Sequence, residues 1–95
     1  MDKTEAKQLQ EDLGVSKEVV LKYPVRLGSG HLLEKLTLRR PKVGDIRAVS
    51  HLATDAEQEL VIFSRLTGLV PEDLDMLDFA DYKVLQNSFR LFQEE

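Results

Sequence analysis

Residues 18–27, EVVLKYPVRL, alternate between two sets of side chains, and this alternation restricts the fold more than any other feature of the chain. Successive side chains of a β-strand point to opposite faces, so the pattern predicts a strand with one buried face. The predicted inner face carries Val19, Leu21, Tyr23, Val25 and Leu27, and the outer face carries Glu18, Val20, Lys22, Pro24 and Arg26. Because Pro24 cannot donate a ladder hydrogen bond, the strand is expected to be an edge at that point.

A turn and a second strand follow. Gly28-Ser29-Gly30 favours a tight turn, because glycine tolerates positive φ. Residues 32–40, LLEKLTLRR, have the apolar spacing of a returning strand. Its candidate inner positions are Leu36, Leu38 and either Leu32 or Leu33. The choice of Leu33 requires a β-bulge near Glu34 and Lys35, and with either choice the two strands form a β-hairpin.

Pro41 marks a change from a period of two to the period of an α-helix, and proline suits the first helical turn. The apolar positions that follow at helical spacing are Val43, Ile46, Val49 and Ala53, with Leu52 beside them. Thr54 and Glu57 have the spacing of a capping box and predict the start of a second helix, which Gly68 ends. Its predicted inner residues are Ala56, Leu60, Phe63 and Leu66 or Thr67, with Val61 and Ile62 widening the stripe.

A short helical turn that starts at Pro71 and a last helix capped by Asp78 complete the predicted order. The last helix carries the apolar stripe Tyr82, Leu85, Phe89 and Phe92. The sequence therefore predicts an α+β fold, with an N-terminal β-hairpin followed by about three helices in a single small domain that spans residues 18–95. Residues 1–17 are interpreted as a polar arm, either a frayed helix or a mobile tail.

The composition excludes several classes of chemistry. The 95 residues contain no cysteine, which removes disulfides, zinc fingers and thiol nucleophiles. His31 and His51 lack the spacing of zinc ligands, and no serine lies in a nucleophile elbow, so we expect no metal, no cofactor and no enzymatic activity. No apolar run approaches the roughly 18 residues of a membrane span, and the N-terminal sequence is too polar for a signal peptide, so we expect a cytosolic protein.

Charge is distributed unevenly along the chain. Residues 1–43 hold nine Lys and Arg against six Asp and Glu, whereas residues 44–95 hold four against eleven, which gives the overall net charge of -4. One interpretation is two solvated faces of one domain. The other is self-complementarity, in which the basic face of one copy meets the acidic face of another and the protein forms homo-oligomers.

Arg39-Arg40-Pro41-Lys42 is a basic cluster at the end of the second predicted strand. As a nucleic-acid contact it is weak, because no aromatic residue lies nearby and the rest of the chain is acidic. A DNA-binding regulator of a mobile element, which would depend on Arg39, Arg40 and Lys42, is therefore the alternative hypothesis. The cluster is also consistent with an ordinary solvated patch at a strand end, or with a docking patch for an acidic helix.

Leu36-Thr37-Leu38-Arg39-Arg40-Pro41, followed by Asp45 and preceded by Leu21-Lys22-Tyr23-Pro24-Val25, resembles the tail assembly chaperone family of contractile-tailed, Mu-like phages and prophages. The similarity continues through Asp55-Ala56-Glu57 and through Gly68, Pro71, Glu72, Leu74, Leu77, Asp81, Tyr82 and Leu85, and so covers about residues 18–90. The ordered set is more specific than any single motif in it.

The resemblance implies a small, non-enzymatic protein of the bacterial host cytoplasm that is absent from the finished tail. Such a protein binds the tape measure protein, keeps it soluble, and helps tail tube subunits assemble around it. We expect the partner to contact the basic residues Arg39, Arg40 and Lys42. We also expect contacts at apolar positions that remain after the core is filled, which are Val20, Leu33, Val61, Val84 and Leu91.

Overall fold

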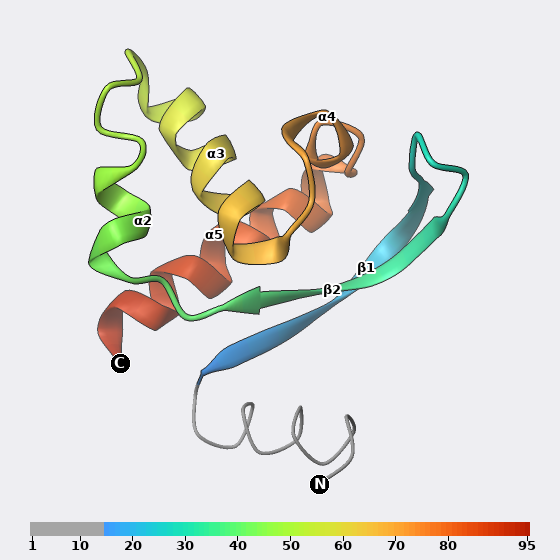
Figure 1. The fold of residues 1–95 in the computed structure, drawn as a ribbon. Helices are drawn as coiled ribbons and strands as arrows, with labels where there is room; N and C mark the ends of the chain where they lie inside the picture. Colours follow the sequence, from blue (N-terminus) through green and yellow to red (C-terminus); the bar gives the residue numbers. More distant parts are fainter. Residues whose placement is uncertain (1–14) are drawn as a thin grey trace, which may run out of the picture.

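The computed structural model describes residues 15–95, which form a β-hairpin followed by helices (Figure 1). The elements, in chain order, are β1 (Ser16–Arg26), β2 (Leu32–Arg39), α2 (Val43–Arg47), α3 (Asp55–Thr67), α4 (Pro71–Leu74) and α5 (Phe79–Glu94). The predicted α+β class and the order of elements are confirmed. Of the predicted arm, residues 1–14 lie outside the described residues, and Ser16 and Lys17 belong to β1.

The two strands pair antiparallel, with Val19 opposite Leu36. Leu33, and not Leu32, occupies the inner position, with only 8% of its surface exposed. The sequence prediction that Leu33 remains available to a partner is therefore wrong, because this side chain is part of the core. The turn is as predicted: the Gly30 N–H donates to the carbonyl of Leu27 at 2.9 Å, and Gly30 has φ 91°.

The hairpin contains a large irregularity on β1. Between the pairs Val20–Lys35 and Val25–Leu33, β1 has four residues where β2 has only Glu34, so the bulge predicted near Glu34 and Lys35 is present, with its extra residues on β1. The strict alternation of β1 breaks there. Tyr23 is consequently 49% exposed, although the period of two placed it on the inner face.

Asp81, on α5, satisfies the backbone of this bulge. The N–H groups of Lys22 and Tyr23 donate to the two carboxylate oxygens of Asp81, at 2.9 and 3.0 Å. Asp81 is buried, so these charge-assisted bonds fix the start of α5 against β1.

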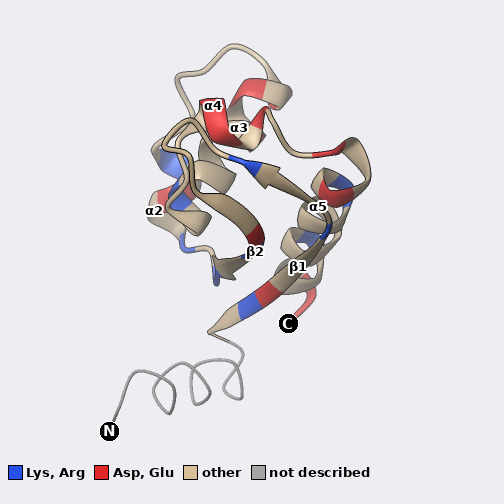
Figure 2. Ribbon diagram, turned by 90° about the vertical axis from the view of Figure 1, so that its right-hand side faces the viewer, with Lys and Arg blue, Asp and Glu red and all other residues tan. Residues whose placement is uncertain are grey.

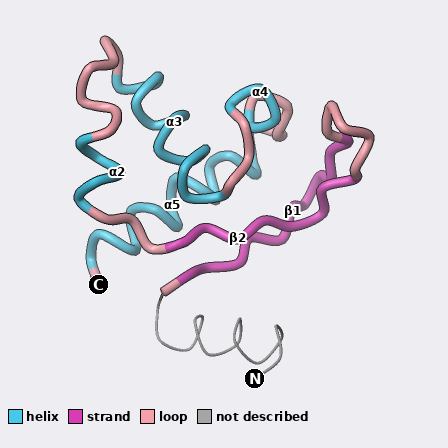
Figure 3. The backbone as a smooth tube through the Cα atoms, in the orientation of Figure 1, coloured by secondary structure: helices cyan, strands magenta, loops and turns pink. Residues whose placement is uncertain are grey.

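The helices cover the inner face of the hairpin, with α3 packed on β2 and α5 packed on β1 (Figure 3). Phe63 of α3 is fully buried, and its ring makes edge-to-face contacts with Tyr82 and Phe89 of α5, with centroids 5.5 and 5.6 Å apart. The buried core comprises Val19, Leu21, Leu33, Leu36, Leu38, Val49, Ile62, Phe63, Leu66, Leu74, Leu77, Leu85 and Phe92. The apolar stripes of α3 and α5 therefore meet in the core, between the helices and the inner face of the hairpin.

Local signals set the helix boundaries as predicted. The Thr54 hydroxyl accepts a hydrogen bond from the Glu57 N–H at 3.1 Å, and α3 ends at Gly68 with φ 80°. Pro71 occupies the first turn of α4. The Asp78 carboxylate accepts from the Ala80 N–H at 2.9 Å and caps α5.

The first helix differs from its prediction. It begins at Val43 and ends at Arg47, so it is much shorter than the apolar pattern indicated. Val43 and Ile46, two of the apolar positions at helical spacing, are exposed, and the buried residue of the helix is Asp45. The reason is the set of ion pairs that Asp45 makes with the rest of the domain, described below.

Candidate functional site

The basic cluster at the end of β2 is mostly engaged within the domain. The Arg39 guanidinium donates to both oxygens of Asp45, at 2.8 and 2.7 Å, and Arg65 of α3 donates to the same carboxylate at 3.0 Å. The N–H of Lys42 adds a fourth bond, at 2.8 Å. The hydrogen bonds from Arg39, assisted by those from Lys42 and Arg65, hold the pKa of Asp45 well below its usual range. Asp45 of α2 thus joins β2 and α3 through Arg39 and Arg65.

Arg40 is directed to the C-terminal turn of α5. Its guanidinium lies 5.5 Å from the centroid of the Phe92 ring and donates to Glu95 at 3.2 Å. Lys17 of β1 approaches the same two residues, at 4.8 Å from the ring and 2.8 Å from the carboxylate. The hydrogen bond from Lys17 is the main reason that the pKa of Glu95 is lowered. Lys42 makes no ion pair with any described residue, and its side chain is exposed.

The apolar candidates from the sequence occupy different environments. Val20 is 73% exposed on the outer face of the hairpin, whereas Val61 is half-buried against the core. Val84 and Leu91 are both exposed and lie seven residues apart on α5, which places them on one face of that helix. Leu33 is buried, as noted above.

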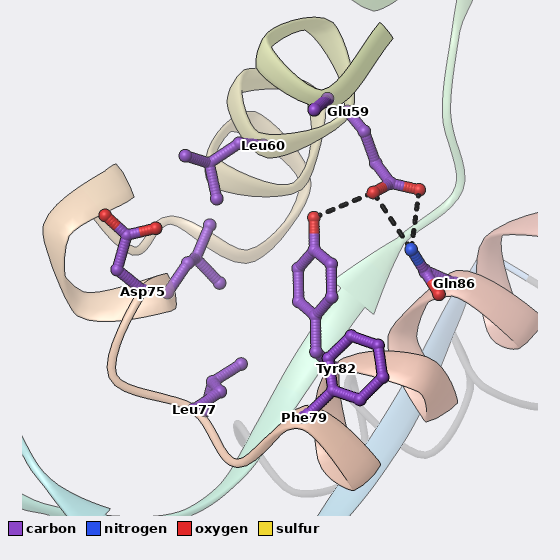
Figure 4. Close-up of a pocket in the computed structure, with 9 residues that line it drawn as sticks. Glu59, Leu60, Asp75, Leu77, Phe79, Tyr82 and Gln86 are labelled. Carbon is purple, nitrogen blue, oxygen red and sulfur yellow. Dashed lines mark hydrogen bonds between the residues drawn. The ribbon is translucent and has the colours of Figure 1, made fainter.

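A pocket that sequence analysis did not find lies between α3, α4 and α5 (Figure 4). It has a volume of about 460 Å³. Its lining residues are Ala56, Glu59, Leu60, Leu74, Asp75, Leu77, Phe79, Tyr82 and Gln86. We call this space the α3–α5 pocket.

One wall of the α3–α5 pocket is a polar cluster around Glu59. The Tyr82 hydroxyl donates to Oε2 of Glu59 at 2.9 Å, and the Gln86 amide donates to both oxygens at 3.2 and 3.0 Å (Figure 4). Burial, followed by the hydrogen bond to Glu59, raises the pKa of Tyr82 far above the physiological range. The hydroxyl therefore stays protonated and keeps donating, which fixes the carboxylate in place.

The pocket also has an exposed aromatic residue on its wall. Phe79 is 69% exposed, and the nearby Met76 is also exposed. The sequence prediction assigned neither residue a role. Phe79 lies three residues before Tyr82 at the start of α5, which is helical spacing. This spacing could have shown from the sequence that the apolar stripe of the last helix continues to Phe79.

A second concave surface lies between the segment 40–46 and the C-terminal half of α5. It has a volume of about 230 Å³. Its lining residues are Arg40, Pro41, Lys42, Val43, Ile46, Phe89, Phe92 and Gln93. We call it the α2–α5 groove. Two exposed apolar residues of α2, Val43 and Ile46, lie here, and the charged lining residues are cations.

These surfaces offer apolar contact and charge, which are binding features. Within residues 15–95, no group of three or more histidine, cysteine, aspartate or glutamate side chains is placed to hold a metal ion. In the same part of the chain, none of the helices combines the length and the hydropathy that a membrane crossing needs.

The sequence model of the family described as "Phage tail assembly chaperone proteins, E, or 41 or 14" matches residues 18–94. The chain belongs to this phage tail assembly chaperone family. The match begins at the third residue of β1 and covers the rest of the hairpin, both concave surfaces and all of α5, so it includes nearly the whole described domain. Membership favours a role in tail assembly over the alternative of a DNA-binding regulator. Neither the curated proteins nor the solved structures that were compared gave a match.

Proposed function

We propose that the chain binds the tape measure protein of its phage, keeps it soluble, and assists assembly of the tail tube around it. Family membership supports the general role in tail assembly. The observation that carries the finer proposal is the α3–α5 pocket with the exposed Phe79 on its wall. A concave apolar surface of this kind buries the apolar side chains of a client helix reversibly.

The proposed role is one of binding without catalysis. The chaperone acts in the cytoplasm of the bacterial host and leaves before the tail is finished. Its client is the tape measure protein, and the tail tube protein is a second partner when the tube grows.

Several exposed residues remain proposed contacts. Lys42 is the member of the basic cluster best placed for a partner, because Arg39 is bound to Asp45 and Arg40 contacts the end of α5. The apolar candidates Val20, Val61, Val84 and Leu91 also remain proposed contacts. Val84 and Leu91 share a face of α5, so these two can contact one partner helix together.

Co-expression tests the proposed function. The chain and the tape measure protein of the same phage are produced together in one bacterial strain, with the tape measure protein alone as control. We expect the tape measure protein to move from the pellet to the supernatant and to co-purify with the chain. If it remains insoluble and the chain elutes alone, the proposal is wrong.

We also propose that the chain associates with itself, because its charge is divided between a basic part and an acidic part. Figure 2 shows acidic residues gathered on α4, away from the cations at the end of β2. Light scattering at several concentrations and salt levels tests this. Oligomers that dissociate as salt rises support the proposal, and a monomer at high micromolar concentration in low salt contradicts it.

A further inference from the structure

The α3–α5 pocket has the size and lining of a site for large apolar side chains. Its volume of about 460 Å³ lies within the range of roughly 300–1,000 Å³ that binding pockets usually have. Leu60 supplies partly exposed aliphatic surface, the core residues Leu74 and Leu77 lie at the base of the pocket, and the exposed ring of Phe79 extends the apolar surface outward. A leucine, methionine or phenylalanine side chain from a partner would lose most of its contact with water there.

The charged residues that line this pocket are both acidic. Glu59 and Asp75 approach the pocket from different sides, from α3 and from the end of α4 (Figure 4). Neither makes an ion pair with any residue in the described part of the chain. The carboxylate of Glu59 is half-buried and held by Tyr82 and Gln86, which are neutral, so its negative charge is fixed and uncompensated.

The surroundings of the pocket have the same sign of charge. Glu72 and Asp73 lie on α4, and Asp78 caps α5 next to Phe79. One nearby cation, Lys83, lies 5.1 Å from the centroid of the Phe79 ring. This cation pairs with neither pocket carboxylate, so it leaves their charge available to a partner.

We propose that the α3–α5 pocket binds a helical segment of the tape measure protein that presents a large apolar residue and, one turn away, a lysine or arginine. The apolar side chain enters between Leu60, Leu77 and Phe79, and the cation reaches Glu59. This inference rests on the proposed function and names the chemistry of the segment bound. Residues one turn apart lie on one face of a helix, so one segment supplies both groups.

The α2–α5 groove provides the contrast within the same domain. It is also apolar, but its charged lining residues are Arg40 and Lys42. Its volume of about 230 Å³ lies below the usual range of binding pockets. A segment with a lysine or arginine beside its apolar residue is therefore matched to the α3–α5 pocket and mismatched to the groove.

Two substitutions test the pocket, each with a matched control. Glu59→Gln removes the charge and keeps an oxygen that accepts from Tyr82, and Glu57→Gln makes the same change on an exposed residue of α3 outside the pocket. Ala56→Phe fills the pocket from an exposed lining position, and Ala48→Phe adds the same ring at an exposed position outside it. Far-ultraviolet circular dichroism and thermal unfolding confirm that all four variants are folded.

Two readouts are used. The first is the amount of tape measure protein that co-purifies with each full-length variant. The second is an amide NMR titration of the wild-type chain with two alanine-rich helical peptides of about 20 residues, long enough to be substantially helical. Both peptides contain a leucine, and one turn later one peptide has lysine and the other has glutamate.

We expect Glu59→Gln to weaken retention by about fivefold, as for a partly exposed ion pair. We expect Ala56→Phe to weaken it by at least about tenfold, and both controls to retain the client like the wild type. The lysine peptide should shift the amides of residues 56–60 and 74–86, and the glutamate peptide should not. Equal retention by Ala56→Phe and the wild type, or equal binding of both peptides, would overturn the inference.

The two proposals fail in different ways. If the wild-type chain retains the tape measure protein and the pocket variants do so equally, the function stands and the pocket inference is wrong. If the wild-type chain retains no tape measure protein, the proposed function is wrong. The peptide titration then tests the proposed chemistry of the pocket by itself. Selective binding of the lysine peptide supports that chemistry, and the absence of selective binding refutes it.

Discussion

Replacing Asp45 by asparagine should destabilise the domain strongly, although the change is nearly isosteric. The carboxylate accepts four hydrogen bonds, from two arginine side chains and one backbone N–H, and its side chain is only 3% exposed. Asparagine keeps one acceptor oxygen and turns an NH2 group toward the guanidinium of Arg39. Two donors then face each other where a charge-assisted pair existed.

The magnitude follows from the exposure of the partners. Removing one partner of a fully buried ion pair costs about 3–5 kcal/mol. The side chains of Arg39 and Arg65 are 42% and 45% exposed, so water partly replaces the lost bonds. We therefore expect the free energy of unfolding to fall by about 2–3 kcal/mol. For a domain of this size, that loss lowers Tm by roughly 10–20 °C.

The effect should depend on pH with a definite sign. In the folded protein the pKa of Asp45 lies well below its usual range, whereas an aspartate in an unfolded chain titrates near about 3.9. The stabilisation by Asp45 is therefore complete above about pH 5 and is lost as the pH falls toward the folded pKa, because only the unfolded chain takes up the proton there. The difference between wild type and Asp45→Asn should shrink between about pH 5 and pH 2.

Urea unfolding followed by circular dichroism measures this difference at each pH. Glu34→Gln is the matched control, because Glu34 is exposed on β2 and makes no ion pair with the described residues. A loss below about 0.5 kcal/mol at pH 7, the size of a typical surface change, would refute the reasoning. A difference that grew in acid would refute it as well.

Three further predictions concern the core, the bulge and the basic cluster. Asp81→Ala should lower the free energy of unfolding by about 2–3 kcal/mol, because two N–H groups of β1 lose their acceptor. The hydrogen-exchange rates of these two amides should rise more than those of the other β1 amides. Phe63→Ala should cost about 3–5 kcal/mol in urea unfolding, and Phe89→Ala less, because Phe89 is only half-buried. Lys42→Glu should leave Tm within a few degrees of wild type. Arg39→Glu should lower Tm markedly, because it places a second acid against Asp45. Equal changes of Tm in the two variants would contradict the conclusion that Arg39 is bound within the domain and Lys42 is not.

The sequence predicted the parts of the fold that local rules control. The hairpin turn requires a glycine with positive φ at Gly30, and the end of α3 requires another at Gly68. The caps at Thr54 and Asp78 each satisfy backbone N–H groups within three residues. Such signals need only neighbouring residues, so they are readable without a structure.

Two of the errors have one physical cause, which is a tertiary contact made by a carboxylate. The spacing of Val43, Ile46 and Val49 predicted a long amphipathic helix, but nothing in that spacing shows that Arg65 lies 20 residues away beside Asp45. The bulge on β1 likewise depends on Asp81, more than 50 residues later.

The candidate site was harder to predict than the fold. The α3–α5 pocket is lined from three separate helices, and no single segment of the sequence shows that they leave a concavity. In the sequence, Glu59 is only the neighbour of the predicted inner residue Leu60. Its contacts with Tyr82 and Gln86, which place it on the wall of the α3–α5 pocket, are visible only in the structure. Exposed apolar residues were sought by elimination from the helical stripes, which found Val84 and overlooked Phe79.

The same buried carboxylates that hold the fold also place apolar residues outside it. On both α2 and α5, a buried aspartate follows an exposed apolar residue by two positions, Asp45 after Val43 and Asp81 after Phe79. Two residues correspond to about 200° of rotation around an α-helix, so the two side chains point in nearly opposite directions. When Asp45 binds Arg39, Val43 must therefore face the α2–α5 groove, and when Asp81 binds the bulge of β1, Phe79 must face the α3–α5 pocket. The α3–α5 pocket that we propose for client binding and the α2–α5 groove are in this way both a consequence of the contacts that stabilise the domain. This explains how a chain this small keeps large apolar side chains exposed without losing its fold.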